Sequence, residues 1–270
     1  MANTNGRILS RRQNEIVAML RETGRVAVED LAAQFDVSPQ TIRRDLNEMS
    51  EARVITRVHG GAIVASSVQN LAYDARKLVA QPHKRLIGEA AARLIEDNSS
   101  LFINIGTTTE EVAHALAGRS GLLVITNNLN VAAELYRNRT IDVIITGGSV
   151  RPNDGGIVGA TTVDLIRQFR VDTAVIGTSA IDEDGTLLDF DIREVHVSRA
   201  IIENARRVIL VTDSSKFSRS APARITTLAD IDILVTDHLP SPAVAELCRI
   251  HDVEVVETGG PQESDPAVTD

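Results

Sequence analysis

The chain has 270 residues, of which 43% are hydrophobic and 24% charged, a composition typical of folded proteins with one or two domains. The single cysteine excludes an internal disulfide and a cysteine-based zinc site. The aromatic content of 3% argues against stacking platforms for single-stranded nucleic acid. No apolar run reaches the ~18 residues of a membrane span, and the first residues lack the apolar core of a signal peptide. We therefore expect a cytoplasmic protein with no membrane partner.

The charge is distributed unevenly along the chain. The net charge is −9, but residues 1–62 contain nine Arg and Lys against eight Asp and Glu, so the acidic excess lies entirely in residues 63–270. An acidic surface repels the phosphate backbone of nucleic acids. We therefore expect any contact with nucleic acid to come from the first 62 residues.

Three helices are predicted in this first segment. Ser10 is placed to cap a helix from Arg11 to about Thr23, and a second helix is expected from Glu29 to Phe35. The pair Ser38-Pro39 begins a third helix, because serine is a common cap and proline fits the first helical position. Apolar side chains at three- and four-residue spacing give this third helix a buried face: Ile42, Leu46 and Met49.

The start of the third helix carries polar and basic side chains outside its apolar face. These candidate DNA contacts are Ser38, Gln40, Thr41, Arg43 and Arg44. In a helix-turn-helix, this part of the second helix enters the major groove, where glutamine can read adenine and arginine can read guanine. The alternative is a three-helix bundle in which the two arginines only face solvent.

A hairpin is predicted directly after the third helix. Residues 53–59 alternate in the manner of a strand, Gly60-Gly61 is a turn signal, and residues 62–64 form the returning strand. A hairpin that follows a recognition helix is a wing, and Arg57 and His59 near its tip are candidate contacts to phosphates or the minor groove. For His59 alone, a surface turn histidine is the competing interpretation.

The rest of the chain predicts an α/β domain at residues 82–258, after a DNA-binding domain at 1–64 and a linker at 65–81. Apolar segments alternate with helical ones, which indicates a mostly parallel sheet covered by helices. The predicted strands are Leu101–Ile105, Leu122–Thr126, Ile141–Thr146, Thr173–Gly177, Val208–Thr212, Ile233–Thr236 and Val253–Val256. Helices are expected at 82–95, 110–117 and 131–137, and the tail at 259–270 is expected to be disordered.

Small and hydrogen-bonding residues follow three consecutive predicted strands. They are Gly106, Thr107, Thr108 and Thr109 after the first, Thr126 and Asn127 after the second, and Gly147 and Gly148 after the third. Ligands of open α/β sheets bind beyond the carboxyl ends of the strands, and a glycine with hydroxyl residues at a helix start offers N–H groups to an anion. Turn geometry explains any one of these segments, but three together favour a phosphate pocket.

Charged residues near the same edge are further candidates. Lys216 follows the strand at 208–212 and is the candidate charge partner of a phosphate, with an exposed loop lysine as the alternative. The acids at 182–194, among them Asp182 and Glu194, are candidates to bind ligand hydroxyls, to act in acid–base catalysis or simply to face solvent. Neither a cofactor nor a metal is expected, because nucleotide-binding glycine motifs and convincing metal-ligand spacings are missing.

Two segments of the DNA-binding domain, VSPQTIRRDL (37–46) and RVHGGA (57–62), closely resemble the winged-helix signature of the DeoR family of bacterial transcriptional regulators. Four more follow the order of that family's effector domain: IGTTT (105–109), ITNN (125–128), TGG (146–148) and DSSKF (213–217). The resemblance implies a fold related to ribose-5-phosphate isomerase and a sugar phosphate ligand. The segments NNLNVA (127–132), DGGI (154–157) and LLDFD (187–191) are similar to those of members that respond to glycerol 3-phosphate.

Three functions are therefore compared. The first is a repressor that binds double-stranded operator DNA and is released by a phosphorylated small molecule, with glycerol 3-phosphate as the first candidate. The second is the same class of repressor with a hexose or pentose phosphate as effector. The third is a sugar-phosphate isomerase with Asp182, Asp189 or Glu194 as base beside Lys216, although an isomerase has no use for a winged helix. Because helix-turn-helix proteins read paired half-sites, we expect a homo-oligomer, either a dimer or a tetramer.

Overall fold

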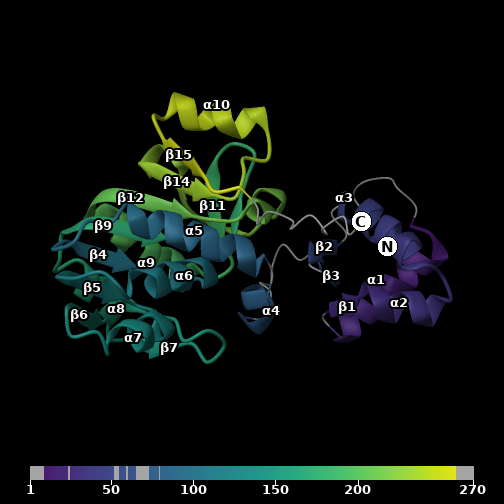
Figure 1. Cartoon of the computed structure of the whole chain (residues 1–270), viewed down its shortest axis with the longest axis horizontal. Helices are drawn as coiled ribbons and strands as arrows, with labels where there is room; N and C mark the ends of the chain where they lie inside the picture. Colours follow the sequence, from purple (N-terminus) through teal and green to yellow (C-terminus); the bar gives the residue numbers. More distant parts are fainter. Residues whose placement is uncertain are drawn as a thin grey trace, which may run out of the picture. The chain divides into compact units, whose positions relative to one another are not determined.

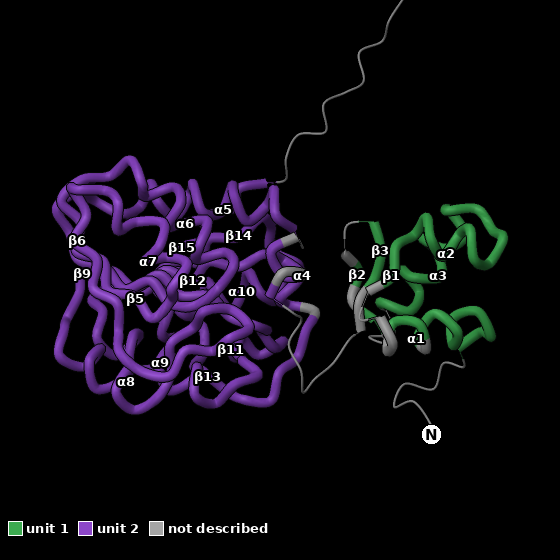
Figure 2. Tube along the Cα trace, turned by 90° about the horizontal axis from the view of Figure 1, so that it is seen from below, with its two compact units in different colours: residues 1–67 green, residues 68–270 purple. Residues whose placement is uncertain are grey.

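The computed structural model describes residues 9–23, 25–51, 55–58, 60–64, 73–78 and 80–259 of the chain (Figure 1). By their internal contacts the residues separate into two compact units, 1–67 and 68–270, and each is described by itself (Figure 2). His59, residues 65–72 of the predicted linker, and the tail beyond Gly259 lie outside the described residues.

The first unit combines helices with a small antiparallel sheet of strand order β1-β3-β2. Its elements are α1 (Arg11–Thr23), β1 (Arg25–Ala27), α2 (Val28–Phe35), α3 (Pro39–Glu51), β2 (Ile55–Val58) and β3 (Gly61–Val64). The three predicted helices and the hairpin are confirmed. Ile42, Leu46 and Met49 are fully buried beneath α3, so the other faces of this helix remain for polar side chains.

A seven-stranded sheet, parallel throughout, forms the centre of the second unit. Its order is β15-β14-β12-β9-β4-β5-β6. The strands are β4 (Ser100–Ile103), β5 (Leu122–Thr126), β6 (Ile141–Ile145), β9 (Val171–Ile176), β12 (Ala205–Val211), β14 (Ile233–Thr236) and β15 (Glu254–Glu257). All seven predicted strands are therefore confirmed, with ends that differ by a few residues.

Helices cover both faces of this sheet (Figure 1). One core contains residues of α5 (Gln81–Arg93), α6 (Thr107–Leu116) and α7 (Leu129–Leu135), and the other contains residues of α8 (Ala160–Ile166), α9 (Ile192–Glu203) and α10 (Pro242–Ile250). Gly88 lets α5 lie close against α6, because a Cβ at this position would lie 2.6 Å from the backbone carbon of Glu111. None of the helices within the described ranges is both long and apolar enough to cross a bilayer.

Several short elements were not predicted. Residues Tyr73–Leu78, inside the predicted linker, form the helix α4. A small antiparallel sheet contains β10 (Ala180–Ile181), β11 (Thr186–Asp189) and β13 (Ala223–Thr227), and a hairpin contains β7 (Ser149–Val150) and β8 (Ile157–Val158). Two 3-10 turns, η1 (Ser214–Ser218) and η2 (Leu228–Asp230), follow β12 and β13. Strands of two to five residues, one with a register shift between Leu187 and Leu188, are too short to show a clear alternation in sequence.

The strand order changes direction between β4 and β9. From β4 the chain continues to β5 and β6 toward one edge, and from β9 it continues to β12, β14 and β15 toward the other. The connections on the two sides diverge and leave a crevice beyond the carboxyl ends of these two strands, where ligands of open α/β sheets bind. The residues that follow Ile103 and Ile176 therefore lie side by side at the site to be examined for ligand contacts.

Candidate functional site

The recognition helix α3 presents an exposed polar surface at its start. Gln40, Arg43 and Arg44 are exposed to solvent. Ser38 Oγ accepts a hydrogen bond from the backbone N–H of Thr41 at 3.2 Å and lies 2.9 Å from the Thr41 hydroxyl, so these two side chains cap the helix. The amino end of α3 thus offers one amide and two guanidinium groups to a partner.

Both arginines make weak ion pairs that a phosphate can replace. Arg43 Nη2 lies 3.8 Å from Glu29 Oε1, and Arg44 Nε donates to Glu48 Oε1 at 3.2 Å. Pairs at the surface contribute little to stability because water and salt screen them. Exchange of these carboxylates for DNA phosphates therefore carries little cost to the fold.

Arg57 on β2 lies close to Arg43 on α3. Burial lowers the pKa of the Arg57 guanidinium, and the neighbouring positive charge of Arg43 lowers this pKa further. Nη1 of Arg57 is buried without a hydrogen-bond partner among the described residues. The recognition helix and the wing thus bring two cations together, an arrangement that attracts an anion such as a DNA phosphate.

An ion pair that was not predicted holds the recognition helix in place. Arg12 Nε of α1 donates to Asp45 Oδ2 of α3, and this hydrogen bond raises the pKa of Arg12. Gln13 Nε2 on the same helix donates to Glu48 Oε2 at 3.3 Å. Both contacts join residues more than thirty positions apart, so no local signal in the sequence identifies them.

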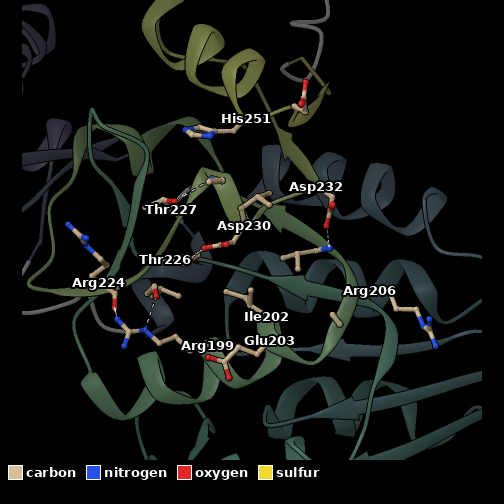
Figure 3. Close-up of a pocket in the computed structure, with 16 residues that line it drawn as sticks. Arg199, Ile202, Glu203, Arg206, Arg224, Thr226, Thr227, Asp230, Asp232 and His251 are labelled. Atoms are coloured by element: carbon tan, nitrogen blue, oxygen red, sulfur yellow. Dashed lines mark hydrogen bonds between the residues drawn. The ribbon is translucent and has the colours of Figure 1, made fainter.

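In the second unit, a cavity of about 830 Å³ opens near the amino ends of β12 and β14 (Figure 3). Many of its polar groups bind one another: Arg199 donates to the carbonyl oxygens of Arg224 and Ile225 at 2.8 Å each, and Asp232 accepts from the N–H of Val208 at 2.7 Å. A ligand has to break such bonds, and ligands of open α/β sheets bind at the opposite end. We therefore do not assign this cavity as the ligand site.

A smaller cavity lies beyond the carboxyl ends of β4 and β9. Five predicted residues line it: Gly106, Thr107, Thr108, Glu194 and Lys216. Asp189, considered above as a possible base, also lines it, whereas Arg76, Thr178 and Ser179 are among the lining residues that were not predicted. The open volume is about 20 Å³, enough for about one water molecule. A larger ligand therefore enters only if lining side chains move.

The turn after β4 is arranged to receive an anion. Gly106 precedes α6, whose first N–H groups have no partners inside the helix and carry partial positive charge. Thr109 Oγ1 lies 2.8 Å from the carbonyl oxygens of both Asn104 and Gly106, so this buried hydroxyl closes the turn and does not face the cavity. Asn104 Oδ1 accepts from the N–H of Gly177 at 3.1 Å and joins the ends of β4 and β9.

Lys216 places a buried amine in this cavity. It lies in η1 with 9% of its surface exposed, and its side-chain amine makes no hydrogen bond or ion pair with the described residues, although its backbone N–H donates to the carbonyl oxygen of Asp213 at 3.0 Å. Burial lowers the pKa of Lys216 well below its usual value, and the nearby charge of Arg219 lowers it further, against the opposing effect of Asp213. A buried, unpaired amine beside the start of α6 is matched by a ligand that brings its own negative charge.

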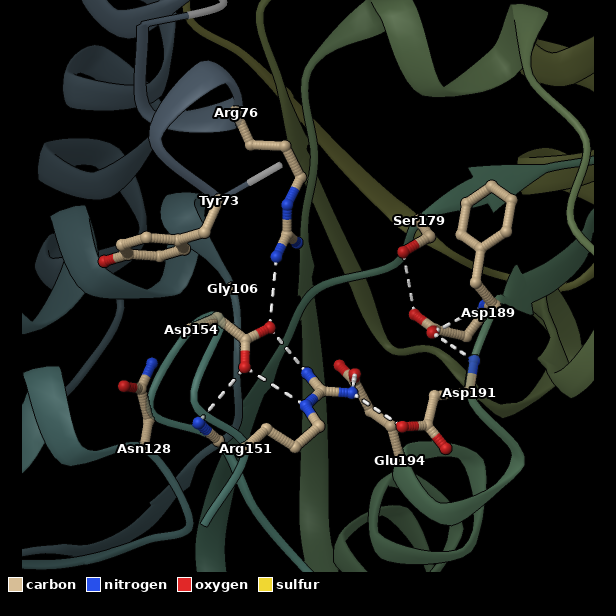
Figure 4. A network of polar contacts seen from close by, with 12 residues as sticks. Tyr73, Arg76, Gly106, Asn128, Arg151, Asp154, Ser179, Asp189, Asp191 and Glu194 are labelled. Carbon is tan, nitrogen blue, oxygen red and sulfur yellow. Dashed lines mark hydrogen bonds and ion pairs between the residues drawn. The ribbon is translucent and has the colours of Figure 1, made fainter. Parts of the chain in front are cut away.

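A network of ion pairs joins two residues that line the cavity, Arg76 and Glu194, through Asp154 and Arg151 (Figure 4). Arg151 Nη2 lies 2.6 Å from Asp154 Oδ2, and Arg151 Nη1 lies 2.6 Å from Glu194 Oε2. Arg76 Nη2 approaches the same Asp154 oxygen at 3.1 Å. Burial raises the pKa of Glu194 to about 8, the charge of Asp189 adds to this, and Arg151 opposes it. Glu194 thus faces the cavity as a carboxyl group that holds its proton more tightly than an exposed glutamate does.

Comparisons with known proteins agree with this division into two units. The DeoR-like helix-turn-helix domain matches residues 12–68, and the DeoR C terminal sensor domain matches residues 79–238. The chain belongs to the DeoR family. The match to the sensor domain includes the whole lining of the small cavity except Arg76.

Relatives of this DeoR-family chain resemble it over nearly its full length. The glycerol-3-phosphate regulon repressor of Escherichia coli (strain K12) is 45% identical over 91% of this chain and 98% of the relative. The protein of the same name from Haemophilus influenzae is 48% identical over 87% of this chain and 92% of the relative. Among solved structures, ribose 5-phosphate isomerase A from Neisseria gonorrhoeae has a TM-score of 0.37 and 14% identity, with 50% of this chain and 52% of that chain covered.

Thr126 ends β5 and Asn127 follows it, but neither lines the small cavity of this DeoR-family chain. Thr126 Oγ1 donates to the carbonyl oxygen of Ile103 at 2.7 Å, and Asn127 Nδ2 donates to that of Ile157 at 3.0 Å. Asn127 Oδ1 is buried without a hydrogen-bond partner among the described residues. Both side chains join neighbouring segments next to the cavity.

The structure does not bring Gly147, Gly148 and Asp182 to the cavity, which corrects our expectation that all candidates converge. β6 is an edge strand, and β5 lies between it and β4, so the end of β6 is two strands away from the cavity at β4 and β9. A Cβ on Gly148 would lie 2.3 Å from Thr162 Oγ1, so packing accounts for this glycine, whose φ is +143°. Asp182 lies in the exposed turn between β10 and β11, whereas the neighbouring acid Asp189 lines the cavity.

The arginines in and beside the small cavity of this DeoR-family chain were not predicted. Arg151 stands three residues before Asp154, a spacing that permits an ion pair within one turn, but only a lysine was expected as the charge partner of a ligand. Arg76 was overlooked because it lies in the segment predicted as a linker. Its partner Asp154 is 78 positions away, and no pattern in a single sequence indicates such a pair.

Proposed function

We propose that this chain is a transcriptional repressor whose affinity for operator DNA is lowered by a phosphorylated small molecule, with glycerol 3-phosphate as the first candidate. The relatives from Escherichia coli and Haemophilus influenzae bear the name glycerol-3-phosphate regulon repressor, and the likeness extends across both units. In this proposal the second unit senses the ligand, and it acts as a regulator without catalysing a reaction. As a DNA-binding repressor, the protein works in the cytoplasm.

One observation carries the choice of a phosphorylated effector. Lys216 is a buried amine without a hydrogen bond or ion pair among the described residues, and it shares a cavity with the amino end of α6. A phosphate supplies the missing negative charge and accepts hydrogen bonds from the N–H groups at Thr107 and Thr108. Glu194 and Asp189 in the same cavity are suited to bind the hydroxyl groups of the ligand.

For the DNA contact, we propose that Gln40, Arg43 and Arg44 reach base edges or phosphates from α3. Arg57 contributes a phosphate contact from the wing, which is supported by its position beside Arg43. Ser38 and Thr41 support this surface by capping α3. Operators of helix-turn-helix proteins have paired half-sites, so we propose that the protein binds DNA as a dimer or tetramer.

A titration of the preformed operator complex tests the proposal. Operator DNA is first isolated by selecting tight binders from random duplexes, and the complex is then titrated separately with glycerol 3-phosphate, glycerol, inorganic phosphate, ribose 5-phosphate and fructose 6-phosphate. Release at the lowest concentration by glycerol 3-phosphate supports the proposal. Release by a pentose or hexose phosphate alone supports the second function that the sequence left open. Release by none of them, or turnover of a sugar phosphate by the purified protein, contradicts the proposal.

A further inference from the structure

Polar contacts hold helix α4 onto the second unit. Tyr73 Oη donates to Glu110 Oε2 of α6 at 2.6 Å, and Asn130 Nδ2 donates to the same hydroxyl at 2.9 Å. At the other end of the helix, Arg76 pairs with Asp154, and Lys84 Nζ of α5 donates to the backbone carbonyl of Arg76. Of these groups, Arg76 lines the cavity, where its guanidinium can pair with a phosphate as well as with a carboxylate.

The place of α4 in the chain connects it to the DNA-binding unit. Eight residues, 65–72, separate the last residue of β3, Val64, from Tyr73. β3 is the second strand of the wing and pairs with both β1 and β2. α4 is therefore the first described element of the second unit that follows the wing along the chain.

Arg76 is both an attachment of α4 and a wall of the effector cavity. Its side chain lines the cavity together with Gly106 and Lys216, and its Nε is buried without a hydrogen-bond partner among the described residues. Its partner Asp154 is also held by Arg151, with Nη2 at 2.6 Å and Nε at 3.1 Å (Figure 4). Arg76 can thus move to a phosphate while Asp154 keeps a guanidinium partner, so the exchange does not leave a buried carboxylate unpaired.

The junction after α4 is strained in the attached state. Ala80, between α4 and α5, has φ +52° and ψ +29°, a left-handed conformation that is unfavourable for residues with a Cβ. The backbone N–H of Lys84 donates to the carbonyl of Ala80 at 2.9 Å, so α5 fixes one side of this residue and the contacts of α4 fix the other. Strain of this kind persists only where surrounding contacts impose it, so loosening of α4 relieves it.

We propose that α4 is a strap that the effector opens: the phosphate takes Arg76 from Asp154, α4 loosens, and operator affinity falls. The inference rests on the proposed function, because it requires a ligand in this cavity that lowers DNA affinity. The cavity has room for about one water molecule while Arg76 lines it, so a larger ligand has to displace a lining side chain. Arg76 is a lining side chain that can exchange its partner Asp154 for the ligand. Because effector and operator oppose each other, the state with a loosened strap is the one that binds DNA weakly.

Two substitutions outside the cavity lining test the strap in opposite directions. Tyr73→Phe removes the hydroxyl that binds Glu110 and keeps the ring, so it should lower operator affinity roughly two- to tenfold and lower the effector concentration for release. Ala80→Asn relieves the strain, because asparagine tolerates the left-handed conformation, so it should tighten operator binding and raise the effector concentration. Unchanged values in Tyr73→Phe, or a shift of both variants in the same direction, would overturn the strap.

Amide hydrogen exchange of the full wild-type chain separates this inference from the proposed function. If the strap opens, residues 73–78 exchange faster when glycerol 3-phosphate is bound. If the wild type binds this ligand and releases operator without any change in exchange at 73–78, the strap is wrong and the proposed function stands. If the wild type neither binds glycerol 3-phosphate nor responds to it, the proposed function fails. In that case the strap is tested by operator affinity without ligand, and it is overturned if Tyr73→Phe binds operator as tightly as the wild type.

Discussion

Glu194 Oε2 lies 2.6 Å from Nη1 of Arg151, and yet the pKa of this carboxyl group is raised above its usual value. Burial is the main cause, since it raises the pKa of Glu194 to about 8, and the charge of Asp189 raises it as well. Arg151 opposes this effect, but its guanidinium is also paired with Asp154 and Asp191. The ion-pair network of the cavity therefore contains a group whose charge changes near physiological pH.

The first prediction is that Glu194 makes stability depend on pH. Its folded pKa of about 8 lies above the unfolded value of 4.5, so the contribution to stability is complete below 4.5 and is lost as pH rises through 8. Glu194→Gln stays uncharged at every pH. As pH rises from 5 to 9, the free energy of unfolding of the wild type should therefore fall by about 1–3 kcal/mol relative to that of the variant, as measured by urea denaturation. Parallel pH profiles of variant and wild type would contradict the pKa of Glu194.

The second prediction concerns the charge of Lys216. Lys216→Ala should weaken binding of glycerol 3-phosphate by about 1.5–3 kcal/mol, since a hydrogen bond to a charged group is lost, while operator affinity without ligand persists. The variant should therefore be a repressor that ligand releases poorly. Isothermal titration calorimetry measures the ligand affinity. Arg85→Ala, which removes one exposed positive charge from the same unit, is the matched control and should bind ligand like the wild type. Equal affinity in Lys216→Ala and wild type would remove Lys216 from the site.

The third prediction is that ligand binding takes up a proton. Burial lowers the pKa of Lys216 in the free protein, and a bound phosphate favours the charged amine and raises that pKa. The affinity for glycerol 3-phosphate should therefore fall as pH rises through the pKa of Lys216 in the free protein. Calorimetry in buffers of different ionisation enthalpy counts the protons. Lys216→Arg is always charged, so uptake at this position should vanish; equal uptake in both proteins would assign the proton to another group.

The fourth prediction concerns the recognition helix. Arg43→Ala or Arg44→Ala should weaken operator binding by about 1–3 kcal/mol if the side chain reads a base, without any change in ligand affinity. Arg11→Ala is a matched control, because Arg11 is an exposed arginine on α1 with an exposed glutamate partner. Electrophoretic mobility shift with operator duplexes measures the effect. Operator affinities like those of the wild type in both variants would show that the two arginines do not contact DNA.

The fifth prediction separates a phosphate contact from a base contact at Arg57. Arg57→Gln should weaken binding to operator and to random duplex by the same factor, because a phosphate contact carries no sequence information. The slope of log affinity against log salt concentration should become shallower by about one unit. A variant with the wild-type slope would make Arg57 a residue of the hairpin surface without a DNA contact.

The sequence alone determined the helices and hairpin of the first unit and the seven strands of the main sheet in the second. Ser38 and Pro39 at the start of α3, with apolar residues at helical spacing after them, specify that helix through contacts between near neighbours, which the structure confirms. The strands of the main sheet were likewise recognised, because apolar runs between helical segments are local signals.

Part of the sensor cavity could also be predicted. Gly106, Thr107 and Thr108 follow a strand and begin a helix, and Lys216 follows another strand, so the rule that ligands bind beyond the carboxyl ends placed them at one edge. The structure brings these residues to the same cavity together with Glu194. The rule does not say which strands are neighbours, and for this reason Gly147 and Gly148 were expected at a site that they do not line.

Only the tertiary structure decided which distant side chains complete the cavity. The placement of β9 beside β4 joins Asn104 to Gly177, and the packing of α4 brings Arg76 to Asp154 across 78 positions. Helical and strand periodicity express interactions between residues close in sequence. Strand order and long-range ion pairs arise from the burial of both faces of the sheet at once, and their partners can be known only when the whole chain has packed.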